Sequence, residues 1–181
     1  MVAGTSTADD PAAADASATA IDGAAADTAV ARAMEWVDAK VPYCQAANHE
    51  PDGDTSCAAT CTRPDNPAWD PYRSDCSGFV SWAWGLPPPG RTTKTLAPGN
   101  TEVSAAIEAA ALQPGDAINN DTHTMLFVAW TTPMTEARFV EEPGCSASEP
   151  WAREVTASVT LSGQSITVAG YGAYTAIRYT P

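Results

Sequence analysis

The chain has 181 residues, 44% of them hydrophobic, and a formal net charge of −13. This length suffices for one domain with a substantial hydrophobic core. The negative charge argues against binding nucleic acid or anionic membrane surfaces through a general electrostatic field. Because no run of about 18 apolar residues occurs, no membrane-spanning helix is predicted. We expect a monomer that binds neither nucleic acid nor a membrane.

The first 27 residues are rich in alanine and contain repeated aspartates. Low-complexity acidic segments of this kind bury too little apolar surface to fold. We predict a disordered leader over residues 1–27 and a single folded domain over residues 28–181. The leader lacks the basic and apolar regions of a secretory signal peptide, so we expect that a signal was removed or that export needs none.

A first helix is predicted from Asp27 or Thr28 to Lys40. Its apolar residues lie on one face, at Val30, Met34, Val37 and Val41. Pro42 ends this helix, and Tyr43 follows at once. Residues 44–72 show little periodicity and are rich in proline and aspartate, which predicts an insertion loop.

Five cysteines occur, at positions 44, 57, 61, 76 and 145. If Cys76 is a nucleophile, the other four can form two disulfides, with three pairings left open. Disulfides would order the loop and indicate an oxidising destination such as the periplasm or the cell exterior. The alternative is a zinc site built from Cys44, Cys57, Cys61 and Cys145, with or without His49. These cysteines lack a paired C-x-x-C spacing, so we predict disulfides, no metal ligands and no cofactor.

A polar turn then leads into Cys76 and an apolar run that contains Phe79 and Val80. Asp75 or Ser74 can cap a helix whose first turn contains Cys76. The free backbone N–H groups and the helix dipole at this end favour thiolate over thiol. This pattern predicts a nucleophilic cysteine, although an inert buried cysteine in a core helix is the alternative.

The rest of the chain predicts one more helix and then a series of strands. The helix is expected from Asn100 or Thr101 to Ala111. The strands are expected at residues 117–118, 123–130, 137–142, 153–160, 164–168 and 174–179. Helices gathered early and antiparallel strands gathered late indicate an α+β domain.

His123 heads an alternating apolar strand, and Glu141 and Glu142 end the next strand. A cysteine at a helix start, a histidine at a strand start and an acid on the following strand match the order of a nucleophile, a base and an orienting residue. Because a one-residue slip reverses the facing of a strand, Glu141 and Glu142 are alternatives for the orienting residue.

At this point the chain resembles the NlpC/P60 family of cysteine peptidases of bacterial cell walls. The matching motifs are Asp75-Cys76-Ser77-Gly78-Phe79-Val80, Leu112-Gln113-Pro114-Gly115-Asp116 and His123 opening a strand. Val41-Pro42-Tyr43 is similar to the tyrosine motif that precedes the cysteine in that family. The chain departs from the family pattern through the long segment between Tyr43 and Asp75 and the missing glycine pair after the tyrosine. The resemblance covers about residues 29–142.

The resemblance implies an α+β, papain-like fold in which N-terminal helices pack on a C-terminal antiparallel sheet of about five to six strands. It implies that Cys76 is the nucleophile, that His123 is the base and that Glu141 orients His123. Tyr43, Asp75 and Ser77 form the expected oxyanion and substrate-binding set, with the Cys76 backbone N–H as a further donor.

The implied function is hydrolysis of a peptide or amide bond in the stem peptide of peptidoglycan. A protein of this kind is secreted or delivered to the periplasm or cell envelope. An acidic single-domain form suits an exported antibacterial toxin, for which an immunity protein is a candidate partner. Two alternatives stay open: a non-catalytic, disulfide-stapled secreted binding module, and an amidase or acyltransferase of the same fold.

Overall fold

The computed structural model of the protein describes residues 23–52, 57–99 and 103–181. The helices are α1 (Gly23–Ala39), α2 (Cys76–Ala83), α3 (Thr93–Leu96) and the 3₁₀ helix η1 (Ala109–Ala111). The strands are β1 (Ser104–Ala106), β2 (Ala117–Asn119), β3 (Thr124–Thr132), β4 (Glu136–Glu141), β5 (Arg153–Ser162), β6 (Ser165–Val168) and β7 (Gly172–Tyr179). Of the predicted leader, residues 1–22 lie outside the described residues, and α1 begins at Gly23, before the predicted start of the helix.

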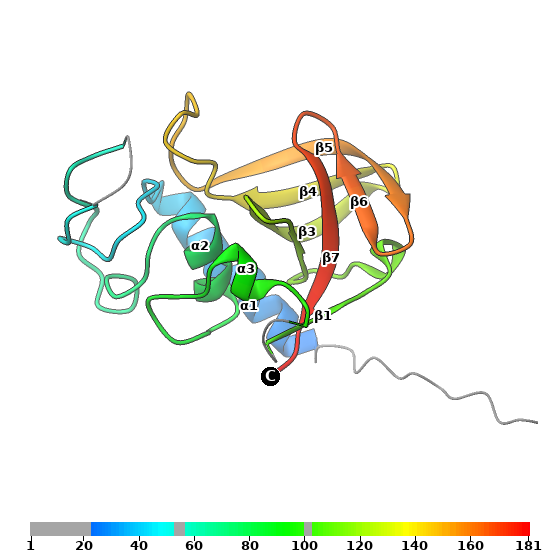
Figure 1. The fold of residues 1–181 in the computed structure, drawn as a ribbon, viewed down its shortest axis with the longest axis horizontal. Helices are drawn as coiled ribbons and strands as arrows, with labels where there is room; N and C mark the ends of the chain where they lie inside the picture. Colours follow the sequence, from blue (N-terminus) through cyan, green and yellow to red (C-terminus); the bar gives the residue numbers. More distant parts are fainter. Residues whose placement is uncertain (1–22, 53–56, 100–102) are drawn as a thin grey trace, which may run out of the picture.

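Six antiparallel strands form a closed barrel, in the order β7–β2–β3–β4–β5–β6, with β6 paired again to β7 (Figure 1). Strand β1 adds to the outer edge of β7. The barrel closes through the antiparallel pairing of β6 with β7, in which Ser165 lies opposite Thr175 and Val168 lies opposite Gly172. Register shifts between β3 and β4, after Phe127 and after Trp130, add local bending that favours such closure.

The predicted papain-like fold, with N-terminal helices packed on a C-terminal sheet, is therefore wrong. The structure is a closed six-stranded barrel, and beyond α1 its described helices have eight residues or fewer. The physical reason is that alternation of apolar and polar residues along a strand indicates only which face of the strand is buried. It does not indicate whether the last strand pairs with the first and closes a barrel.

The helix predicted up to Ala111 is also wrong. The described part of this segment contains β1 and η1. Ser104–Ala106 pairs with β7 in register from Tyr179 to Ile177, so pairing with a distant strand overrides the helical preference of alanine.

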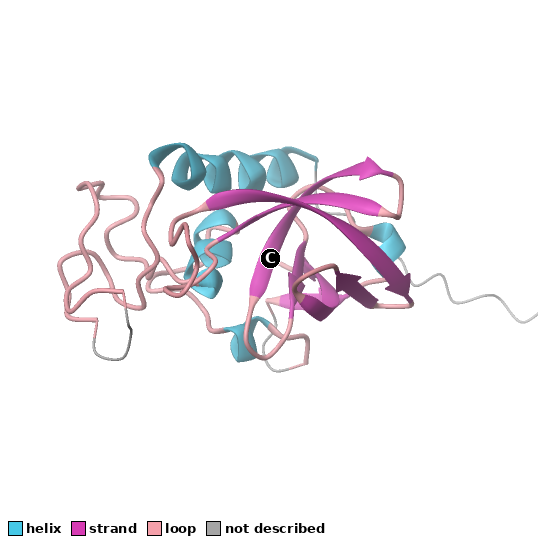
Figure 2. Cartoon of the chain, turned by 90° about the horizontal axis from the view of Figure 1, so that it is seen from above, coloured by secondary structure: helices cyan, strands magenta, loops and turns pink. Residues whose placement is uncertain are grey.

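Two hydrophobic clusters occupy the two faces of the strands. Phe127, Phe139 and Ile166 belong to the cluster that contains the inward-facing residues of the barrel. Leu126 and Val140, one position away along the same strands, belong to the second cluster. That second cluster is shared with α1 and α2, which pack against each other, and α2 packs on β3. Figure 2 shows α1 along one side of the barrel.

None of the helices in the described ranges combines the length and the apolar character needed to span a membrane.

Candidate active site

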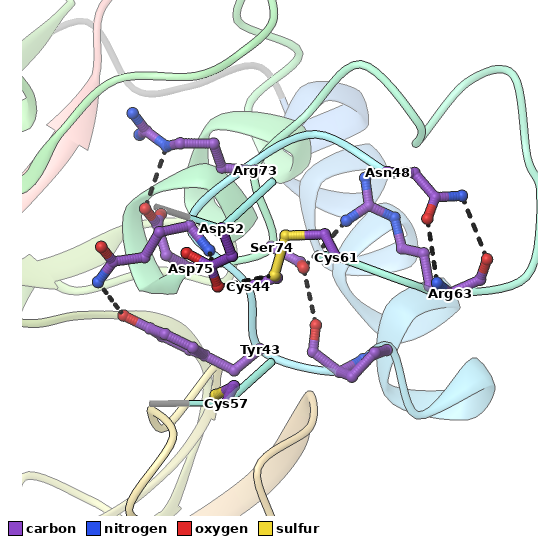
Figure 3. Close-up of a disulfide and its surroundings, with 12 residues drawn as sticks. Tyr43, Cys44, Asn48, Asp52, Cys57, Cys61, Arg63, Arg73, Ser74 and Asp75 are labelled. Carbon is purple, nitrogen blue, oxygen red and sulfur yellow. Dashed lines mark hydrogen bonds and ion pairs between the residues drawn. A yellow bond between two sulfur atoms is a disulfide. The ribbon is translucent and has the colours of Figure 1, made fainter. Parts of the chain in front are cut away.

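The start of α2 is held by a compact polar cluster. Asp75 is the N-cap residue, and its Oδ1 accepts hydrogen bonds from the Gly78 amide at 2.6 Å and from Ser77 Oγ at 3.0 Å. Arg73 Nε lies 3.0 Å from Asp75 Oδ2 (Figure 3). The predicted cap is thus confirmed with Asp75 as the residue. Because Asp75 and Ser77 are engaged with each other, their side chains stabilise the helix start that presents Cys76.

Gly78 permits this tight turn. A Cβ atom at this position would collide with the backbone carbonyl of Arg73. The Arg73-Ser74-Asp75 backbone therefore folds back against the first turn of α2, which only glycine allows.

Cys76, the first residue of α2, is the one free cysteine among the five, all of which lie in the described ranges. Its side chain is buried, with 8% of the residue exposed. Burial raises the pKa of the thiol to about 12, and the Asp75 carboxylate adds to this rise. The backbone amides of Thr124 and Ser77 oppose it, as does Arg73. The expected lowering of the thiol pKa is therefore wrong for this state, because desolvation outweighs the helix terminus.

His123 lies immediately before β3, after a turn held by Asn120. The Asn120 side-chain oxygen accepts from the His123 amide at 2.8 Å. The next residue, Thr124, contributes its backbone amide to the surroundings of the Cys76 thiol, so the thiol lies at the start of β3. His123 Nε2 is 2.7 Å from Glu141 Oε2. The structure thus gathers residues from α2, the start of β3 and the end of β4.

Glu141 is fully buried, yet its carboxylate is well satisfied. Its Oε2 meets His123, whereas Oε1 accepts from Arg153 Nη2 at 2.9 Å and from the Tyr171 hydroxyl at 2.8 Å. Burial alone raises the pKa of Glu141, but the hydrogen bonds from His123, Tyr171 and Arg153 outweigh burial and hold the pKa below its ordinary value. Glu141 is therefore an ionised acceptor for the His123 ring.

Glu142 is also fully buried, but it lies apart from this network. Within the described residues its two carboxyl oxygens have no hydrogen-bond partner. Burial raises its pKa well above the ordinary value, Asp75 and Glu141 raise it further, and Arg63 only partly compensates. The surroundings of Glu142 therefore favour its protonated form, and Glu141 is the acid that reaches His123.

Tyr43 lies in the loop after α1, near Cys76 and Asp75. Its hydroxyl accepts from Gln45 Nε2 at 3.0 Å. Burial raises the pKa of Tyr43 to about 12, and the charges of Cys76, Asp75 and Asp52 contribute to this rise. The hydroxyl therefore keeps its proton and can donate a hydrogen bond, as an oxyanion donor requires.

The disulfides are Cys44–Cys61 and Cys57–Cys145, and the prediction of two disulfides is confirmed. Figure 3 shows the first of them beside Tyr43, Asp52 and the start of α2. Although Cys44, Asp52 and Cys61 bring ligand atoms within 4.8 Å of one another, oxidised sulfurs offer no thiolates to a metal. The zinc alternative does not fit this pairing, and His49 instead forms an exposed pair with Asp65.

Three polar residues near the site were not predicted from the sequence. Arg153 and Tyr171 contact Glu141, and Arg63 spans the insertion from Ser74 Oγ to the carbonyls of Trp69, Asp70 and Tyr72. Arg153 stands directly opposite Glu141 in the β4–β5 register. The signal that could have identified it is this cross-strand pairing of opposite charges.

The sequence matches no protein-family model and no curated protein. Among solved structures, the chain is similar to the peptidoglycan hydrolase RipB from Mycobacterium tuberculosis, with a TM-score of 0.51 and 16% sequence identity. The match covers 86% of this chain and 64% of that one, so the chain spans less than two thirds of the length of RipB. At this identity the likeness concerns the fold.

Proposed function

We propose that the chain is a cysteine peptidase of the NlpC/P60 type that hydrolyses a peptide or amide bond in peptidoglycan stem peptides. The observation that carries this proposal is the arrangement of a free thiol at the start of α2, a histidine at the adjoining start of β3 and a buried carboxylate that binds the histidine at 2.7 Å. The fold likeness to a peptidoglycan hydrolase and the agreement of the sequence motifs support the choice of substrate.

In this proposal the resting thiol keeps its proton, because its pKa lies near 12. Glu141 accepts the Nε2–H of His123, which leaves Nδ1 as the free acceptor. As Cys76 Sγ bonds to the substrate carbonyl carbon, Nδ1 takes the thiol proton. The Cys76 backbone N–H and the Tyr43 hydroxyl donate to the carbonyl oxygen as it gains charge.

In the second half of the reaction, His123 transfers the proton taken from the thiol to the leaving amine. His123 protonates the amine as the carbon–nitrogen bond breaks, and a thioester to Cys76 remains. Water then attacks the thioester carbon while His123 accepts a proton from the water. The carbon–sulfur bond breaks, the carboxyl product leaves, and His123 returns the proton to the Cys76 sulfur.

Digestion of purified muropeptides, followed by mass spectrometry of the products, tests this function. The wild-type protein should cleave one bond type, and Cys76→Ala should lower the rate by at least about a hundredfold. Met134→Ala, at an exposed position in the β3–β4 turn, is the control and should be as active as the wild type. Full activity of a folded Cys76→Ala variant would exclude the proposed nucleophile.

A second candidate function is a non-catalytic, disulfide-stapled binding module. The buried thiol with its raised pKa favours this reading. Such a module would sediment with insoluble peptidoglycan, equally well with and without Cys76→Ala, and would release no product. Retention on peptidoglycan together with product formation that depends on Cys76 identifies the peptidase.

We further propose delivery to the cell envelope as an antibacterial effector, supported by the two disulfides, which form in oxidising compartments. Expression directed to the periplasm of a test bacterium should then lyse the cells, whereas cytoplasmic expression should not. Co-expression with neighbouring open reading frames would reveal an immunity protein as a suppressor of lysis.

A further inference from the structure

We propose that Arg153 and Tyr171 are positioning residues that hold Glu141 so that one of its oxygens faces His123. This inference rests on the proposed function, in which His123 is the base. Neither residue belongs to the sequence motifs, and both act through Glu141 rather than on the substrate.

The two oxygens of Glu141 have separate tasks. Among the described residues, Oε2 is hydrogen-bonded to His123 alone, at 2.7 Å. Oε1 accepts from Arg153 Nη2 at 2.9 Å, from Arg153 Nε at 3.1 Å and from the Tyr171 hydroxyl at 2.8 Å. Because both oxygens are bonded, rotation of the carboxylate about its terminal bond would break several contacts at once. The carboxylate is thereby fixed in the orientation that His123 requires.

Tyr171 also contacts His123 directly through its ring. The two rings lie 6.3 Å apart between centroids, with planes 14° from parallel, and Tyr174 meets His123 edge-on at 6.4 Å. The His123 ring is therefore confined by two aromatic side chains as well as by Glu141.

Strand pairing and turns of the barrel determine where these two residues lie. Arg153 is the first residue of β5 and pairs with Glu141, the last residue of β4. Tyr171 precedes β7 in the turn that follows β6. Both residues lie on strand or turn segments of the barrel, whereas the thiol comes from α2.

Electrostatics reinforce the same arrangement. The titratable and charged groups around Glu141 are His123, Arg153, Tyr171, Glu142 and Tyr174. Of these, Arg153 carries the permanent positive charge, and its side chain is 26% exposed. Without it, a buried carboxylate would face His123 and two tyrosines, and protonation of Glu141 would become easier.

The test uses Tyr171→Phe, which keeps the ring and removes the hydroxyl, and Arg153→Lys, which keeps the charge and removes the planar fork. Arg153→Gln removes both charge and fork. Arg138→Gln is the matched control, because Arg138 and Glu154 form an exposed ion pair on the same two strands. Thermal melts establish that each variant is folded.

The main measurement is the tautomer of His123, read from nitrogen-15 NMR at neutral pH. The chain has two histidines, so His49 serves as the internal reference. Wild type and Arg138→Gln should show His123 with its proton on Nε2. Arg153→Gln and Tyr171→Phe should show a mixture of tautomers, and Arg153→Lys should lie between wild type and Arg153→Gln.

Kinetics give the second measurement. On muropeptides, kcat should fall by about tenfold in Tyr171→Phe and more in Arg153→Gln, with KM unchanged, because the misplaced group does not touch the substrate. The acidic limb of the pH–rate profile should move to higher pH in Arg153→Gln. An unaltered tautomer and kcat in Tyr171→Phe and Arg153→Lys would overturn the inference, as would an equal loss in Arg138→Gln.

The two proposals fail separately. If wild type cleaves no muropeptide but the His123 tautomer changes in Tyr171→Phe and Arg153→Lys, the proposed function fails and the positioning role stands. If wild type cleaves muropeptides and the variants match it in both measurements, the function stands and the positioning role fails.

Discussion

Glu141 and Glu142 are consecutive, both are fully buried, and their surroundings are opposite. Glu141 accepts hydrogen bonds from His123, Arg153 and Tyr171, and these interactions lower its pKa in spite of burial. The Glu142 oxygens have no hydrogen-bond partner among the described residues, and burial raises its pKa. Burial alone therefore does not decide the charge of a carboxyl group, whereas the supply of donors does.

Strand alternation produces this difference. Phe139 and Glu141 share the face of β4 that belongs to the barrel interior, whereas Val140 belongs to the cluster shared with the helices. Glu142 follows on the helix side, where it is coupled to Asp75 and Arg63. Two consecutive residues thus have pKa values that are shifted in opposite directions.

The largest expected effect is on catalytic activity, which should depend on Glu141 and not on Glu142. Glu141→Gln should lower kcat/KM by about a hundredfold, because an amide can present its N–H to His123 and favour the wrong tautomer. Glu142→Gln should leave kcat/KM unchanged. Muropeptide cleavage by both purified variants measures this contrast. A loss confined to Glu142→Gln would move the orienting role to that residue.

The next effect concerns stability. Glu142→Met should stabilise the fold by about 1–3 kcal/mol at pH 8, because it removes a buried carboxyl group that has no hydrogen-bond partner among the described residues. The pKa of Glu142 is higher in the folded chain than in the unfolded chain. Between these two pKa values the unfolded chain binds fewer protons, so the wild type loses stability as pH rises towards the folded-state pKa. Urea unfolding of both proteins from pH 4 to pH 9 should show this decline in the wild type and a flatter curve in Glu142→Met.

A smaller effect of opposite sign is expected for Glu141. Its lowered pKa stabilises the fold above the unfolded-state value, and this contribution is lost as pH falls through the folded value. Thermal melts between pH 6 and pH 3 should show a steeper loss of stability in wild type than in Glu141→Gln. Parallel curves would mean that Glu141 has the same pKa folded and unfolded.

The smallest effect is expected outside the buried pair. Arg138 and Glu154 lie on the same strands, 3.4 Å apart, with side chains 45% and 40% exposed. Arg138→Gln should change stability by less than about 1 kcal/mol, because solvent screens exposed ion pairs. Urea unfolding at low and high salt gives the measurement. A larger loss would show that β4–β5 pairing itself depends on this bridge.

Short sequence patterns were enough to predict the helix cap and the later strands, because these depend on neighbouring residues. The Asp75 cap follows from its position before an apolar run, and the later strands follow from alternation. An even number of remaining cysteines was enough to predict two disulfides, but their pairing needed the fold. The order of the strands also indicates that an acid at the end of β4 meets His123.

The features that depend on distant packing could not be predicted in the same way. Alternation is identical in an open sheet and a closed barrel, so closure was missed. Alanine-rich residues 104–106 form a strand because β7 pairs with them. The pKa of Cys76 depends on how deeply α2 is buried, which its own residues do not encode. Arg153 becomes relevant only once its register opposite Glu141 is known.

Barrel closure also dictates when the site can exist. β7 pairs with β2, and the Arg178–Asp116 bridge beside this pairing joins residues 62 positions apart in the sequence. Tyr171 takes its place beside His123 only after β6 and β7 have paired. Contacts of such long range form late and slowly during folding. In a nascent or unfolded chain, Tyr171 therefore does not yet contact Glu141 and His123, and we expect the proposed hydrolytic activity to appear only after the barrel has closed.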